Sequence, residues 1–239
     1  MVATDKFVFI HLPRTGGTFL TKLIRKFFPS AREIGHHLPR EFVPDTYSHL
    51  PLLGTVRNPW DFYVSLYHYV WPKDAKTVLA AWMTENGTLG FEASVRNLLN
   101  LGVDNERLDR LIDMLPEQLD YSRRNVPGFA KDAMRKIRGS GVGYYTVRFN
   151  QMFGAGDDVF FCRLERLSQD LLTFFERTGS LTVMLRQFLL SSHKINAADH
   201  LHYSRYYSPE LAELVLSRDG LLIDRFGYKF EQFDPSANL

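Results

Sequence analysis

Short apolar runs alternate along this chain with stretches in which apolar side chains follow a helical spacing. Residues 6–12 (KFVFIHL), 51–56 (PLLGTV) and 159–165 (VFFCRLE) have the pattern of short buried strands. Helical spacing occupies 18–28, 59–70, 74–84, 90–101, 104–120 as far as Pro116, 130–138, 144–153, 167–178 and 208–219. Strands that alternate with helices predict an α/β fold in three layers, with a parallel central sheet. No linker-like stretch interrupts the sequence, so we interpret residues 1–239 as a single domain.

A loop rich in glycine, residues 13–18 (PRTGGT), joins the first predicted strand to the first predicted helix. Two adjacent glycines let successive backbone N–H groups point at one anion, and the helix N-terminus adds partial positive charge. Arg14 adds a full charge, while Thr15 and Thr18 add hydroxyl groups. The segment therefore predicts a phosphate-binding loop, and a plain tight turn is the alternative. It is not a Walker A motif, which disfavours a nucleoside triphosphatase.

A second candidate anion site follows the second predicted strand, in residues 55–67 (TVRNPWDFYVSLY). Arg57 leaves the strand end, and Asn58-Pro59 signals the start of a helix. Ser65 lies about two turns along that helix. The guanidinium and the hydroxyl are able to converge on one phosphate. The alternative is an arginine that caps the strand end and a serine that faces solvent.

Together the two segments resemble the sulfotransferases that use 3′-phosphoadenosine 5′-phosphosulfate (PAPS). PRTGGT is similar to the family's 5′-phosphosulfate loop, P-K-x-G-[GST]-T, and 57–67 is similar to its 3′-phosphate motif, R-[ND]-P-x5-S-x-Y. The resemblance extends to 160–175, with Glu165 at the family's acidic position, to 193–215 and to 226–230. It implies a P-loop-like strand-loop-helix and transfer of the sulfuryl group of PAPS to an acceptor hydroxyl, with no metal.

The resemblance also implies which residues bind PAPS. Those at matching positions are Arg14, Thr15, Gly16, Gly17, Thr18, Arg57 and Ser65. Many members carry lysine where this chain has Arg14; arginine supplies charge there but does not give up a proton. Lys194 lies in a segment that folds over the nucleotide in the family, and a solvated loop is the alternative interpretation.

Sulfuryl transfer to a hydroxyl needs a general base, and histidine suits that role at neutral pH. Carbohydrate-type members that this chain resembles place their catalytic histidine in the segment after the first helix. His37 is therefore the predicted base, with His36 as second choice, whereas His11 is predicted to be structural, with its ring beneath the loop. Adjacent histidine side chains are expected to diverge, and no Cys or carboxylate spacing supports a metal site.

The charge, the cysteine count and the lengths of the apolar runs argue against some classes of protein. The net charge is 29 − 27 = +2, which argues against a nucleic-acid binder. The single cysteine, Cys162, lies in a predicted core strand, so we expect it to serve packing. One cysteine forms no disulfide within the chain, which suits a reducing compartment. No apolar run approaches the roughly 18 residues of a membrane helix, so we expect a cytoplasmic protein without a transmembrane segment. The acceptor, a small molecule or a carbohydrate, and the oligomeric state are not specified.

Two other functions remain open at this point. One is a non-catalytic nucleotide-binding scaffold on the same fold, which would bind adenosine 3′,5′-bisphosphate without turnover. The other is a small-molecule kinase that uses ATP, although the loop lacks the Walker lysine.

Overall fold

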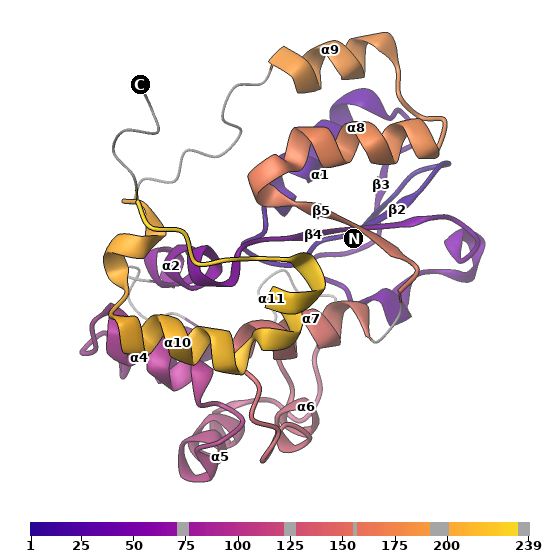
Figure 1. Cartoon of the computed structure of the whole chain (residues 1–239). Helices are drawn as coiled ribbons and strands as arrows, with labels where there is room; N and C mark the ends of the chain where they lie inside the picture. Colours follow the sequence, from indigo (N-terminus) through magenta and orange to yellow (C-terminus); the bar gives the residue numbers. More distant parts are fainter. Residues whose placement is uncertain (71–76, 122–127, 155–156, 192–200, 234–239) are drawn as a thin grey trace. The chain divides into compact units, whose positions relative to one another are not determined.

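The computed structural model describes residues 1–70, 77–121, 128–154, 157–191 and 201–233 (Figure 1). The chain forms two compact units, each built from two segments. The sheet unit comprises Met1–Arg57 and Phe149–Ala197, and the helical unit comprises Asn58–Arg148 and Ala198–Leu239. The interpretation of 1–239 as a single domain stays a prediction.

All strands of the central sheet belong to the sheet unit. They are β1 (Val2–Ala3), β2 (Val8–Ile10), β3 (Arg32–Glu33), β4 (Leu52–Val56) and β5 (Val159–Arg163), in the order β3-β1-β2-β4-β5. The three strands expected from the sequence, β2, β4 and β5, are parallel, as predicted. Of the two added strands, β1 pairs antiparallel with both β2 and β3 and so runs opposite to them, which makes the sheet mixed and mostly parallel, not wholly parallel. Both added strands have two residues, too few for a periodic pattern to indicate them.

Helices α1 (Gly17–Phe27), α8 (Leu167–Arg177) and α9 (Val183–Ser191) share an apolar core with one face of this sheet (Figure 1). Phe7, the residue before β2, belongs to this core, and its ring centroid lies 5.3 Å from that of Phe174. Two further helices, the 3-10 helices η1 (Arg40–Phe42) and η2 (Asp45–Tyr47), precede β4, and η3 (Leu164–Arg166) follows β5.

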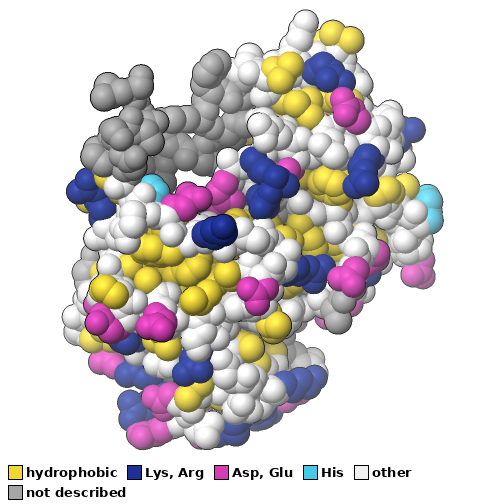
Figure 2. Space-filling model, in the orientation of Figure 1, with side chains coloured by type: hydrophobic (Ala, Val, Ile, Leu, Met, Phe, Trp, Pro, Cys, Tyr) yellow, Lys and Arg dark blue, Asp and Glu magenta, His cyan; other side chains and the backbone are white. Residues whose placement is uncertain are grey.

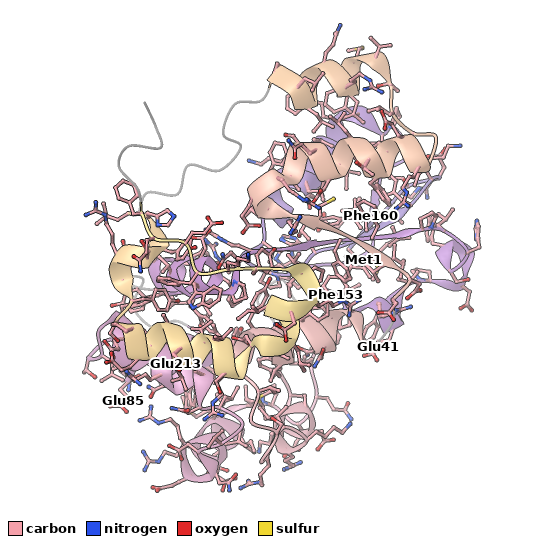
Figure 3. All side chains as sticks on the ribbon, viewed as in Figure 1. Met1, Glu41, Glu85, Phe153, Phe160 and Glu213 are labelled. Atoms are coloured by element: carbon pink, nitrogen blue, oxygen red, sulfur yellow. The ribbon has the colours of Figure 1, made fainter. Side chains whose placement is uncertain are left out.

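The opposite face of the sheet is covered by the last turn of α7 (Tyr144–Phe153). Successive side chains of a strand alternate between the faces, so Phe160 packs on Phe174 of α8 while Phe161 packs on Phe153. Figure 3 labels Phe160 and Phe153, which lie on opposite sides of the strands. Gly54 of β4 permits this contact, because a Cβ there would lie 2.9 Å from the Phe153 ring. The sheet is thus covered on both faces, compatible with three layers.

The helical unit contains the other helices of the described chain. They are α2 (Pro59–Val70), α3 (Val78–Thr84), α4 (Phe91–Leu99), α5 (Asn105–Met114), α6 (Lys131–Arg135), the first turns of α7, η4 (Tyr203–Tyr206), α10 (Pro209–Arg218) and α11 (Gly220–Phe226). Asn58 caps α2, since its Oδ1 accepts a hydrogen bond of 3.0 Å from the backbone N–H of Trp60. The predicted helix start at Asn58-Pro59 is confirmed. The Trp60 indole donates to the carbonyl of Ala212, which ties α2 to α10.

A fully buried carboxylate, Asp219, lies at the junction of α10 and α11. Its oxygens accept hydrogen bonds from the hydroxyl of Tyr63 at 2.6 Å, and from the backbone N–H and the hydroxyl of Thr146 at 2.9 and 2.7 Å. These bonds join α2, α7 and the α10–α11 corner inside the helical unit. Burial raises the pKa of Asp219 above its ordinary 3.8, against the opposing effect of the hydrogen bonds.

Cys162 lies in the core, whereas α9 exposes apolar side chains. Cys162 of β5 is fully buried, and burial raises the pKa of its thiol well above the ordinary value, which confirms a packing role. On α9 the side chains of Val183, Met184 and Leu190 are exposed, and hydrophobic side chains are visible over α9 in Figure 2. Within the described part of the chain, no helix has the length and apolar character needed to cross a membrane.

Candidate functional site

The glycine loop leads from β2 into α1, in the strand-loop-helix context expected from the sequence. Gly16 is the residue before the helix and has a φ of 87°, in the left-handed region where glycine is favoured. Arg14 also has a positive φ, 65°, which is uncommon for a residue with a side chain. The loop therefore curls tightly around the N-terminal end of α1, where backbone N–H groups attract anions.

Gly17 is the first residue of α1, and its lack of a side chain has a specific cause. A Cβ built there would lie 1.9 Å from Cδ2 and 2.2 Å from Nε2 of His11. The His11 ring thus lies directly against the start of the helix. This arrangement agrees with the expectation that His11 is a structural residue beneath the loop.

The two threonines of the loop have different surroundings. The hydroxyl of Thr15 is fully buried and lies 2.7 Å from both the Leu12 carbonyl and the Thr55 hydroxyl. Its side chain thereby ties the loop to the end of β4. Thr18 is exposed in the first turn of α1, where its hydroxyl is accessible to an anion.

Arg57 and Arg14, the two cations expected at strand ends, are brought together. Arg57 is buried, and its Nη1 donates a hydrogen bond of 3.3 Å to the backbone carbonyl of Arg14. A guanidinium has five N–H donors, so one arginine is able to bind several acceptors at once. The contact also supports the unusual backbone of Arg14. With Thr55, Arg57 connects the loop to β4, a connection that the sequence pattern did not indicate.

Three histidines form a cluster beside the loop. His11 follows β2, and His36 and His37 lie in the segment between β3 and η1. Ring centroids are 4.4 Å apart for His11 and His37, and 3.9 Å apart for His36 and His37. The expectation that the side chains of His36 and His37 diverge is therefore wrong, because His37 adopts a positive φ of 52° that turns its side chain toward its neighbour.

The members of this cluster differ in solvent access. His36 is exposed, His37 is half-buried and His11 is buried. Burial, followed by the neighbouring His37, holds the pKa of His11 well below its ordinary 6.5. His11 is consequently neutral at physiological pH. Across the described ranges, no group of three or more His, Cys, Asp or Glu side chains is arranged to hold a metal ion.

The remaining candidates are not brought into this cluster. Ser65 is buried on α2 and belongs to the helical unit, so its convergence with Arg57 on one phosphate stays a prediction. Lys194 lies outside the described residues. Glu165 is exposed on η3, while the buried carboxylate of that region is Asp170, which accepts a hydrogen bond of 2.8 Å from the backbone N–H of Arg163.

Comparison of the chain with models of known protein families, with curated proteins and with solved structures found no match. We therefore infer the function from the motifs of the chain and from the geometry of the loop and the histidine cluster.

Proposed function

We propose that this protein is a sulfotransferase that moves the sulfuryl group of PAPS to the hydroxyl of a small-molecule or carbohydrate acceptor. The observation that carries the proposal is the loop at the start of α1. It combines a left-handed Gly16, a strained Arg14 and an exposed Thr18 with the guanidinium of Arg57 on its backbone. Because both segments resemble the PAPS-binding motifs, we propose PAPS as the anion that the loop binds.

In this proposal the loop holds the 5′-phosphosulfate. Backbone N–H groups of Gly16, Gly17 and Thr18, with the positive end of α1, surround its oxygens. Arg14 stabilises the negative charge that develops on the bridging oxygen as the sulfur–oxygen bond breaks. Arg57, with Ser65, binds the 3′-phosphate.

His37 acts as the general base. It accepts the proton of the acceptor hydroxyl while the acceptor oxygen bonds to sulfur and the bond from sulfur to the bridging phosphate oxygen breaks. Adenosine 3′,5′-bisphosphate leaves with the electron pair of that bond. Positioning and electrostatics dominate such a transfer, by analogy with phosphoryl transfer. His36, the second choice for the base, lies beside His37 on the exposed side of the cluster.

The Arg57→Ala variant tests the site. Loss of a charged hydrogen bond to the 3′-phosphate is expected to weaken adenosine 3′,5′-bisphosphate binding by about 2–3 kcal/mol, measured by isothermal titration calorimetry. Arg32→Ala is the matched control, because Arg32 is an exposed cation of the same unit. Equal affinity of Arg57→Ala and the wild type would show that the site assignment is wrong.

A non-catalytic nucleotide-binding scaffold is the second candidate. It is favoured by the structural uses of the same residues, since Arg57 supports the loop backbone and the Thr15 hydroxyl is bonded inside the protein. The His37→Ala variant distinguishes the two functions. Unchanged affinity for adenosine 3′,5′-bisphosphate with loss of sulfation of a labelled acceptor panel supports the enzyme. Absence of sulfation by the wild type across the panel supports the scaffold, and a strong preference for ATP supports a kinase.

A further inference from the structure

The histidine cluster contains a hydrogen bond that determines which nitrogen of His37 is basic. Nδ1 of His37 lies 3.0 Å from the backbone carbonyl oxygen of His11. A carbonyl oxygen has no proton to donate, so the hydrogen of this bond belongs to Nδ1. In the neutral ring the lone pair is then on Nε2, and this nitrogen is the one able to accept a proton.

The backbone of His37 is held in a conformation that only its surroundings explain. A φ of 52° costs energy in a residue with a side chain, and it persists where neighbouring groups over-determine it. The bond to the His11 carbonyl and the contact between the two rings, 4.4 Å apart, are such constraints.

His11 is itself fixed on several sides. Its ring lies against the backbone of Gly17, is stacked at 5.8 Å on the ring of Phe9, and is buried. Because burial holds its pKa well below 6.5, the ring is neutral and places no second positive charge beside His37. His11 therefore joins the start of α1, where the anion is proposed to bind, to the ring of His37.

We infer that His11 is a positioning residue that holds His37 in the Nδ1–H tautomer, in which Nε2 is the nitrogen that accepts the proton of the acceptor hydroxyl. The functional part of this inference rests on the proposed sulfotransferase activity. The structural part, the tautomer of His37 and its dependence on His11, holds with or without turnover.

The test begins with nuclear magnetic resonance of the full chain labelled with ¹⁵N at histidine. Long-range ¹H–¹⁵N correlation spectra, with resonances assigned by a His37→Gln variant, report the protonated nitrogen of each neutral ring. The expected result is Nδ1–H for His37. A neutral His37 that carries its proton on Nε2 overturns the inference, whatever the activity of the protein.

Two substitutions then separate positioning from packing. His11→Ala keeps the carbonyl that accepts the Nδ1–H bond but removes the ring that fixes His37 beside it, and is expected to lower both the Nδ1–H population of His37 and kcat, the latter by about fivefold or more. His11→Phe keeps a ring between Gly17 and His37 and is expected to restore both. His49→Gln is the control, because His49 is an exposed histidine of the same unit that lies outside the cluster.

The outcomes distinguish this inference from the proposed function. If the tautomer is Nδ1–H in the wild type but no acceptor is sulfated, the proposed function fails and the positioning of His37 stands. If His11→Ala leaves the tautomer and kcat unchanged, the inference fails and the sulfotransferase proposal survives. If His11→Ala does not fold, the wild-type spectrum and His11→Phe decide, and loss of the Nδ1–H signal in His11→Phe overturns the inference.

Discussion

Arg14 and His37 share a backbone conformation that is uncommon for residues with side chains. Among the described residues, positive φ values outside glycine also occur at Glu85 and Asn86, where α3 ends in a left-handed turn. No helix end accounts for Arg14 or His37. Strained residues of this kind concentrate at functional sites. The loop motif points to Arg14, and the resemblance to the sulfotransferases points to His37.

Gly17 provides a test at the residue scale. Gly17→Ala places a Cβ within 2.2 Å of two atoms of the buried His11 ring, which has little room to move. We expect the free energy of unfolding to fall by about 1–3 kcal/mol, as in other overpacked sites, and adenosine 3′,5′-bisphosphate to bind more weakly. Denaturant unfolding and calorimetry measure the two effects.

Gly90→Ala is the control for this substitution. A Cβ at Gly90, the residue before α4, meets nothing within 4 Å. Because alanine is less favoured than glycine at an N-cap, we expect it to lower the free energy of unfolding by about 0.5–1 kcal/mol and to leave adenosine 3′,5′-bisphosphate binding unchanged. If Gly17→Ala is as mild as Gly90→Ala in both measurements, the close contact of His11 with the loop is wrong.

At the scale of elements, the sequence predicted the helices that have clear cap residues or a clear apolar periodicity. It missed helices in which that periodicity is obscured. Helix α2 begins and ends at the predicted residues, because Asn58 and Pro59 mark its start. Helix α9 was missed: Val183 and Leu190 on its outward face are apolar, which obscures the periodicity that its inward leucines create. The helix predicted over 208–219 is observed as α10, with Ser208 and Asp219 as its caps, and α11, which the sequence did not predict, follows it.

Asp219 provides the test at this scale. Since its pKa is raised in the folded state, the protonated form favours folding, and that contribution is lost as the pH rises from 3.8 through the folded-state pKa. Asp219→Asn is expected to abolish this fall in the free energy of unfolding with rising pH, while keeping the bonds to Thr146. Urea unfolding from pH 4 upward, at about one-unit steps, measures the difference between variant and wild type.

A companion variant, Asp219→Ala, leaves three buried donors of Tyr63 and Thr146 without an acceptor. At about 1–3 kcal/mol for each unpaired group, it should lower the free energy of unfolding by about 3 kcal/mol or more. Asp224→Asn, an exposed aspartate of α11, is the control and should follow the wild type. A parallel pH dependence of Asp219→Asn and the wild type would contradict the raised pKa.

At the scale of the whole molecule, the chain passes between its two units at 57–58, 148–149 and 197–198. The first passage lies between Arg57 and the Asn58 cap of α2, and the second lies within α7. Neither position has a linker composition, which is why the sequence indicated one domain. Most of the candidate residues, including the loop, Arg57 and the histidine cluster, belong to the sheet unit.

Because most candidate residues belong to the sheet unit, a bound nucleotide is expected to stabilise that unit against thermal unfolding. A ligand at 100 times its Kd stabilises the native state by about 2.7 kcal/mol, which raises the melting temperature of a chain of this size by about 5–10 °C. In differential scanning calorimetry, adenosine 3′,5′-bisphosphate should shift the transition that contains the sheet unit. ADP, which lacks the 3′-phosphate, and the Arg57→Ala variant should shift it less. An equal or larger shift with ATP would favour a kinase.

The sequence by itself determined the α/β alternation, the three parallel strands, the helix start at Asn58 and the position of the glycine loop. These features depend on the local periodicity of apolar residues and on the conformational preferences of single residues. Both are set by residues that are close together in the chain. Only the tertiary structure decided the antiparallel pairing of β1 with β2 and β3, the division into two units and the hydrogen bonds of the loop. The bonds from Thr55 and Arg57 to the loop join residues that are 40 and 43 positions apart in the sequence. Such contacts are set by packing in three dimensions, and no spacing along the chain encodes them.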